Sequence, residues 1–172
     1  RWKQEHGKPD AEIVEVLSHQ SMSDIEMKRI LIQNGFHIDF PSEVMQECAA
    51  ISDVISAEEI KKRTDYRDIL TITIDPADAK DFDDAISYRI LPSGDYEVGV
   101  HIADVTHYVH ENTALDKEAL ARSTSAYLVD RVCPMLPEKL SNELCSLRPH
   151  EDKLTFSAVF TFDKDEKIVE RW

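Results

Sequence analysis

Apolar and polar residues alternate along several short stretches of the chain, which predicts β-strands because strand side chains point to opposite faces in turn. These stretches are residues 69–74, 85–90, 96–102, 154–162 and 167–172. The turn-forming sequence PSGD at residues 92–95 joins the second stretch to the third and predicts a β-hairpin. Short extended pieces are expected at residues 127–129 and 132–136.

Apolar residues recur at helical spacing in the first half of the chain and again after the hairpin. The predicted helices cover residues 23–34, 41–51, 56–63 and 115–123, with one or two helical turns over 137–144. The expected N-caps are Ser23, with Glu26 completing a capping box, Ser56 and Thr113, and Gly35 is expected to end the first helix. Separate runs of helices and strands of this kind predict an α+β fold.

Five aspartates fall within the ten-residue sequence DPADAKDFDD, which we call the acid loop: Asp75, Asp78, Asp81, Asp83 and Asp84. Carboxylates held about 4 to 6 Å apart repel one another by roughly 1 to 4 kcal/mol per pair at surface-like dielectric constants. A folded chain must therefore spread them, protonate them or bind a cation. We expect the strand over residues 69–74 to fix Asp75 and the loop to curl the later aspartates back toward it. The loop offers oxygen ligands and neither His nor Cys, which favours Mg²⁺ or Mn²⁺ over zinc.

The acid loop has three other possible interpretations. An EF-hand needs Gly at its sixth position and Glu at its twelfth, where this chain has Lys80 and Ile86, so that interpretation fails. A haloacid dehalogenase-like phosphotransferase also places an aspartate after a strand, but it needs Asp-x-Asp-Gly-Thr, and residues 81–85 lack the Gly and Thr. A solvated acidic loop without a ligand is the third interpretation, and the spacing alone does not exclude it.

Three longer blocks of sequence resemble the catalytic RNB domain of the ribonuclease II family, and most closely its RNase R branch. They are residues 73–85 (TIDPADAKDFDDA), 100–109 (VHIADVTHYV) and 134–147 (PMLPEKLSNELCSL), in the order that the family shows. Three blocks at family-like spacing are more specific than a single acidic loop. The resemblance implies a processive exoribonuclease that removes 5′-mononucleotides from the 3′ end of single-stranded RNA with Mg²⁺, or with Mn²⁺.

The resemblance also implies the roles of individual residues. Asp75, Asp81, Asp83 and Asp84 match the four family aspartates one for one. We expect Asp75 and Asp84 to hold one ion, with Asp81 and Asp83 serving a second ion or its waters. Asp83 is expected to be the most sensitive position in catalysis. Tyr127 matches an aromatic residue that stacks on the last nucleotide at the 3′ end of the RNA.

The resemblance divides the chain into three parts. Residues 1–20, which include the β-branched stretch 11–17, match the last strand of a cold-shock barrel of the OB type. Residues 21–65 form a helical connector, and residues 66–172 form the first part of an RNB domain with a partial mixed or antiparallel sheet. Family members complete the active site with an arginine and acidic residues from later in the domain, so we expect this chain alone to hydrolyse RNA poorly.

Composition changes this picture in one respect. The 172 residues carry a formal net charge of −14, whereas proteins that bind a phosphate backbone are normally basic. Metal ions at the acid loop would invert the local sign, and we expect the strongly basic surfaces to lie on other segments. A non-catalytic RNA-binding or assembly module therefore stays open as an alternative.

The remaining features indicate an ordinary cytoplasmic protein. No run of 18 apolar residues predicts a membrane span, and the N-terminal sequence RWKQEH lacks an apolar signal core. Cys48, Cys133 and Cys145 form no close pair and no metal-finger spacing, so we expect them to be buried thiols in a reducing compartment. The partners that the resemblance implies are single-stranded RNA and RNA-degradation or ribosome-associated machinery.

Overall fold

The computed structural model describes residue 13 and residues 21–172, which belong to two compact units, Arg1–Ile38 and Asp39–Trp172. In the first unit the described element is helix α1, Met22–Gln33. The strand predicted over residues 11–17 lies outside the described residues, except for residue 13.

Helix α1 confirms the predicted first helix but not its cap. Ser21 accepts a hydrogen bond from the backbone N–H of Asp24 at 3.1 Å, so the predicted cap Ser23 lies inside the first turn. The capping box with Glu26 is therefore wrong, and this carboxylate pairs instead with Arg29 at 2.6 Å. Ser21 takes the cap because its backbone is extended while its carbonyl already accepts the first helical bond, from Ile25.

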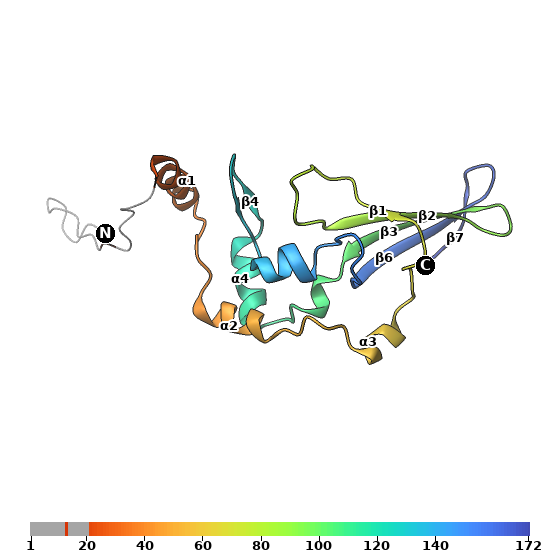
Figure 1. Cartoon of the computed structure of the whole chain (residues 1–172), viewed down its shortest axis with the longest axis horizontal. Helices are drawn as coiled ribbons and strands as arrows, with labels where there is room; N and C mark the ends of the chain where they lie inside the picture. The colour runs from red at the N-terminus through yellow and green to blue at the C-terminus, as the bar shows by residue number, and fades with distance from the viewer. Residues whose placement is uncertain (1–12, 14–20) are drawn as a thin grey trace, which may run out of the picture. The chain divides into compact units, whose positions relative to one another are not determined.

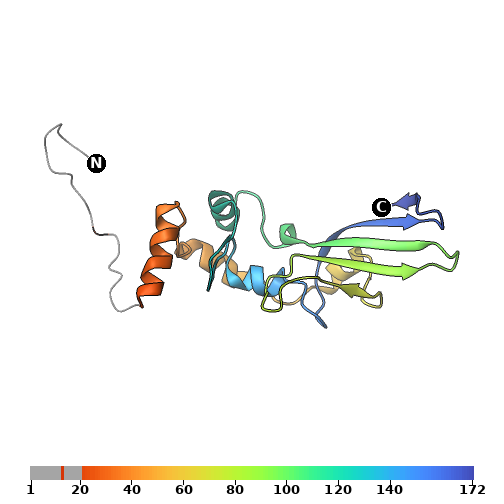
Figure 2. The same cartoon turned by 90° about the horizontal axis from the view of Figure 1, so that it is seen from above.

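The second unit is built on one antiparallel sheet with the strand order β1-β2-β3-β6-β7. The strands are β1 Thr71–Ile72, β2 Asp84–Ile90, β3 Tyr96–Ala103, β6 Thr155–Phe162 and β7 Ile168–Arg171. Figures 1 and 2 show β2, β3 and β6 as the long central strands. The predicted hairpin is confirmed, with Gly94 at φ 87° in its turn. The predicted α+β class is likewise confirmed, with an antiparallel sheet.

The other helices and short strands of this unit gather at one end of the sheet, except the helix over residues 57–62, which Figure 1 shows below the sheet. They are α2 Ser42–Ala50, α3 Ala57–Lys62, the 3₁₀ helix η1 Val105–His107, α4 Ala114–Arg122, β4 Ala126–Tyr127, β5 Val132–Cys133 and the π-helix η2 Lys139–Leu144. Ser56 and Thr113 cap α3 and α4 as predicted, accepting from the N–H groups of Glu59 at 3.1 Å and Asp116 at 3.3 Å.

The hydrophobic core of this unit lies between the helices, at the end of β3. Its buried members are Val44, Cys48, Ala103, Leu115, Leu136, Leu140, Leu144 and Cys145. Helix α2 therefore shares a core with α4 and η2. Arg122 closes the same region, because its guanidinium stacks on the ring of Phe40 at 3.8 Å and pairs with Glu118 at 2.8 Å. Arg122 is therefore a buried structural residue.

One face of the sheet buries a cluster of polar side chains beside the apolar Ala85 and Val159. His101 is 4% exposed, and its two ring nitrogens lie 2.7 Å from Ser157 Oγ and 2.8 Å from Ser87 Oγ. Gly99 makes room for this group, since a Cβ there would come within 2.4 Å of Ser87 Oγ. The ring of Tyr66 lies 5.1 Å from that of His101 and so covers the polar cluster.

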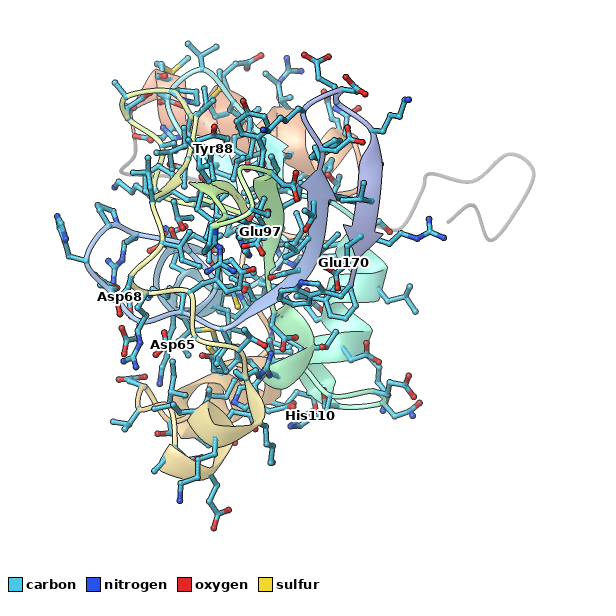
Figure 3. The ribbon with its side chains drawn as sticks, turned by 90° about the vertical axis from the view of Figure 1, so that its right-hand side faces the viewer. Asp65, Asp68, Tyr88, Glu97, His110 and Glu170 are labelled. Carbon is cyan, nitrogen blue, oxygen red and sulfur yellow. The ribbon has the colours of Figure 1, made fainter. Side chains whose placement is uncertain are left out.

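Tyr66 also ties the segment before β1 to this face of the sheet. Its hydroxyl donates to Glu97 at 3.1 Å, and Glu97 in turn pairs with Arg89 at 2.6 Å. Glu97 is labelled in the side-chain view of Figure 3. The opposite face carries apolar residues that are more than a third exposed: Ile86, Tyr88, Val100, Ile102 and Phe156. The sheet is therefore covered on its polar face and open on its apolar one.

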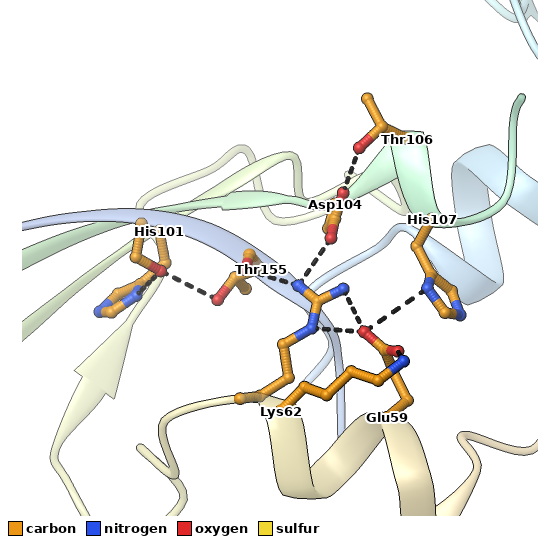
Figure 4. A network of polar contacts seen from close by, with 9 residues as sticks. Glu59, Lys62, His101, Asp104, Thr106, His107 and Thr155 are labelled. Atoms are coloured by element: carbon orange, nitrogen blue, oxygen red, sulfur yellow. Dashed lines mark hydrogen bonds and ion pairs between the residues drawn. The ribbon is translucent and has the colours of Figure 1, made fainter. Parts of the chain in front are cut away.

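A second polar network joins helix α3 to the end of the sheet (Figure 4). Arg63 lies at its centre, 2.6 Å from Asp104 and 2.7 Å from Glu59. Asp104 also accepts from the hydroxyl of Thr106 at 2.6 Å, so it acts as a structural hydrogen-bond acceptor. A charged group with several good partners inside a fold fixes the geometry of the elements that it joins.

The expectation that the cysteines are buried thiols is confirmed for Cys48, Cys133 and Cys145. Within the part of the chain that the structure describes, every helix is too short or too polar to cross a membrane.

Acidification is expected to destabilise the second unit through His101. Burial lowers the pKa of His101 below its ordinary value of about 6.5. Below about pH 6.5 the unfolded chain therefore binds a proton at His101 more readily than the folded chain does. The free energy of unfolding is highest above that pH and decreases as the pH falls below it. Urea unfolding of wild type and H101Q at pH 7.5 and 5.5 should show a smaller pH-dependent loss in the variant. Equal losses in both proteins would contradict this role.

Candidate metal centre

The acid loop connects the short edge strand β1 to the central strand β2. The strand predicted over residues 69–74 is paired only at Thr71 and Ile72, opposite Ser87 and Ile86. Asp75 therefore follows the strand at a distance of three residues and is exposed, so the expectation that a strand end fixes it is wrong. The pairing of β1 with β2 ends at Ile72, so Asp75 lies in the loop and not at the end of a strand. Asp84 instead is the first residue of β2, opposite Ile102 of β3.

The second half of the acid loop is held by backbone hydrogen bonds from two distant segments. Ser146, which is fully buried, donates its hydroxyl to the carbonyl of Lys80 at 2.7 Å and accepts from the N–H of Phe82 at 3.1 Å. The N–H of Leu147 donates to Phe82 O at 2.9 Å. The N–H of Ala103 donates to Asp83 O, also at 2.9 Å. Residues 80–83 are thus attached to the core, and sequence reasoning did not find this attachment.

The electrostatics show which carboxylates lie near one another. Burial, followed by the negative charges of Asp81, Asp84 and Asp75 in that order, raises the pKa of Asp83 above its ordinary value. Asp78, in the turn closed by the bond from Ala79 N–H to Pro76 O, does not contribute to this shift and is exposed. The four aspartates that the family resemblance selects are therefore the ones whose charges meet at Asp83.

These carboxylates do not converge on a single point. Across residue 13 and residues 21–172, no three His, Cys, Asp or Glu side chains are grouped closely enough to hold one ion as they stand. Like charges are expected to spread in this way. The donor set is nonetheless suited to Mg²⁺ or Mn²⁺, since it consists of carboxylate oxygens around a residue whose ionisation the others oppose.

Tyr127 comes to the acid loop from a distant part of the sequence. The β4–β5 pairing places Tyr127 opposite Val132, and its hydroxyl donates to Asp81 Oδ2 at 2.5 Å. That hydrogen bond is the main cause that raises the pKa of Tyr127 to about 12. The side chain is 64% exposed, which excludes a core tyrosine. Its hydroxyl is therefore fixed while its ring remains open to solvent.

Two basic residues, one in the acid loop and one outside it, line the same hollow. Lys80 and Arg148 line a hollow of about 340 Å³, together with Phe82, Asn142 and Glu143. Arg148 is paired with Glu151 at 3.0 Å, and because both side chains are exposed this ion pair contributes little to stability. Lys80 and Phe82, which line this hollow, are also the two loop residues whose backbone bonds Ser146, so the hollow lies against the anchored part of the acid loop.

A family model and the sequence relatives of this chain indicate the same protein family. The RNB domain model matches residues 63–172. The chain is 45% identical over 157 residues to ribonuclease R 1 of Lactococcus lactis, covering 91% of this chain and 19% of that protein. It is 48% identical over 156 residues to DIS3-like exonuclease 2 of Schizosaccharomyces pombe, covering 88% and 17%. The chain thus spans about a fifth of the length of these relatives.

Solved structures agree with the sequence relatives. RNase R of Mycoplasma genitalium, in complex with ribose-methylated single-stranded RNA, superposes with a TM-score of 0.77 at 36% identity, covering 86% of this chain and 23% of that one. Yeast Ssd1, described as a pseudonuclease, superposes with a TM-score of 0.70 at 26% identity, covering 87% and 19%. The same fold therefore occurs in a protein described as a nuclease and in one described as a pseudonuclease.

Neutralising Asp83 is expected to stabilise the metal-free protein and to remove its response to divalent cations. D83N should raise the unfolding free energy by no more than about 1 kcal/mol, because the side chain reaches solvent and is screened. Added Mn²⁺ should raise the melting temperature of wild type by mass action and leave D83N nearly unchanged. D78N is the matched control and should respond like wild type. Thermal unfolding with and without MnCl₂ measures both effects, and an equal response of wild type and D83N would exclude Asp83 from the site.

Proposed function

Since the chain belongs to the RNB domain family, we propose that it carries the metal-binding and 3′-end-binding part of an exoribonuclease that shortens single-stranded RNA in the 3′-to-5′ direction. The observation that supports this most is the meeting of two features at Asp81. Its charge is one of the three that raise the pKa of Asp83, and its carboxylate accepts the hydroxyl of Tyr127. A candidate metal ligand and a candidate base platform are thus in direct contact.

The four aspartates have distinct roles in this proposal. Asp75 and Asp84 hold one ion most directly, and Asp81 and Asp83 hold a second ion or its waters. Divalent cations, when bound, lower the pKa of a coordinated water and stabilise charge on the phosphate and the leaving oxygen. The anchored segment 80–83 keeps Asp81 and Asp83 in place, while the half of the loop that carries Asp75 contains the turn closed by the bond from Ala79 N–H to Pro76 O.

Tyr127 serves the RNA rather than the metal. Stacking of an aromatic ring on a base contributes about 1 to 3 kcal/mol and does not depend on which base it is. An enzyme that degrades any sequence needs a contact of this kind at the last nucleotide. The hydrogen bond to Asp81 holds the hydroxyl end of the ring at the acid loop. A terminal nucleotide stacked on this ring would therefore lie beside the carboxylates.

The net charge of −14 gives the proposal a clear consequence. A phosphate backbone is repelled by an acidic surface and attracted by bound cations, which invert the local sign. The RNA affinity of this chain should therefore depend on the metal. A non-catalytic assembly module, which the likeness to Ssd1 keeps as the rival function, has no such requirement.

Binding of a 5′-labelled single-stranded RNA with a 3′-hydroxyl tests the proposal against this rival. Mg²⁺ is expected to tighten binding by about tenfold or more, and D83N should abolish that gain while D78N keeps it. Fluorescence anisotropy measures the affinity, and gels of the same samples follow the RNA length. Any shortening should proceed stepwise from the 3′ end and disappear in D83N. Affinity that ignores Mg²⁺, or internal cleavage, would refute the proposal.

Two substitutions at Tyr127 separate its ring from its hydroxyl. Y127A removes the stacking surface and should weaken RNA binding in Mg²⁺ by about 5- to 150-fold, the equivalent of 1 to 3 kcal/mol. Y127F keeps the ring and should stay within about threefold of wild type. Anisotropy titrations of the three proteins provide the comparison. If Y127F binds as weakly as Y127A, the hydroxyl and not the ring accounts for the contact.

A further inference from the structure

We propose that Ser146 is the positioning residue of the acid loop: its buried hydroxyl fixes the backbone on both sides of Asp81 and so sets where Asp81 and Asp83 stand before any ligand binds. The inference deepens the proposed function, because it treats the acid loop as the metal site. It concerns a residue that lies 65 positions from Asp81 in the sequence and that carries no charge.

The geometry of Ser146 is that of a clamp. One hydroxyl uses both of its capacities, donating to Lys80 O at 2.7 Å and accepting from Phe82 N–H at 3.1 Å. These two groups flank Asp81 directly. A hydroxyl that bonds both neighbours of one residue restrains the backbone dihedral angles of that residue, and therefore the direction of its side chain.

The base of the clamp is rigid. Ser146 is fully buried, and it follows η2 and Cys145, which contribute Leu140, Leu144 and Cys145 to the hydrophobic core. Close packing gives such residues little freedom to shift. The position of the acid loop is thus tied to the packing of the core rather than to the loop itself.

Two further bonds extend the restraint to Asp83. Leu147 N–H donates to Phe82 O, and Ala103 N–H donates to Asp83 O, each at 2.9 Å. Ala103 also belongs to the core. The carboxylates of Asp81 and Asp83 repel each other, so a loop without these bonds would relax by moving them apart. The clamp opposes that relaxation.

The acid loop is therefore a preorganised site on its C-terminal side. Residues that orient metal ligands from outside the ligand sphere typically change metal affinity by 10- to 100-fold when they are replaced. Ser146 acts on the backbone of the ligands rather than on the carboxylates, so we expect an effect near the lower end of that range.

The test compares S146A with S87A in the whole chain. Ser87 is a matched control, because it is 1% exposed and its hydroxyl bonds His101 at 2.8 Å instead of the acid loop. Hydrogen exchange of the Phe82 amide, followed by NMR, reports the clamp without metal. Binding of Mn²⁺, followed by electron paramagnetic resonance, reports the site. S146C, which has similar volume and a weaker donor, gives a conservative variant that is expected to lie between wild type and S146A.

In S146A, exchange at Phe82 should accelerate by at least tenfold while β2 and β3 stay protected, and the Kd for Mn²⁺ should rise about tenfold. S87A should leave both values within about threefold of wild type. Unchanged exchange at Phe82 in S146A would overturn the inference, as would an equal loss of Mn²⁺ affinity in S87A. If S146A loses protection throughout, S146C decides by the same two criteria. If wild type itself does not bind Mn²⁺, the proposed function fails, and the exchange measurement still decides the role of Ser146.

Discussion

Repulsion between carboxylates is the constraint on which the rest of this structure depends. Asp75, Asp81, Asp83 and Asp84 are brought near enough for their charges to oppose the ionisation of Asp83. Such an arrangement raises the free energy of the fold, so it must be imposed by stronger interactions elsewhere. The interactions that impose it are backbone hydrogen bonds to residues 80–83, made by a buried hydroxyl and by amides of core segments.

The fold supplies this support by keeping its main apolar core and a buried polar cluster in different places. The main apolar core lies between α2, α4 and η2 at one end of the sheet, and the acid loop is fastened to that end. The covered face of the sheet holds the polar cluster around His101 instead, closed by Tyr66. The network centred on Arg63 joins α3 to the same region. Packing and polar networks therefore both serve to hold the ends of strands where the site lies.

The candidate site is exposed to solvent at Tyr127, whereas residues 80–83 are attached to the core. Tyr127 has an exposed ring although its hydroxyl is bonded to Asp81, which is the arrangement that a stacking contact beside a metal site needs. In a chain with a net charge of −14, attraction for a phosphate backbone must come from cations or from other surfaces. The acidity of the chain and its proposed RNA substrate are compatible for that reason.

The sequence by itself determined most of the local elements and predicted which carboxylates would serve as ligands. Alternation and turn residues predicted the hairpin of β2 and β3, capping residues predicted α3 and α4, and the family blocks selected four of the five aspartates. Only the tertiary structure decided that β1 ends at Ile72, that Tyr127 meets Asp81, and that Ser146 holds the loop. Local patterns report the preferences of neighbouring residues, whereas these three features depend on bonds and packing between segments that are distant in sequence.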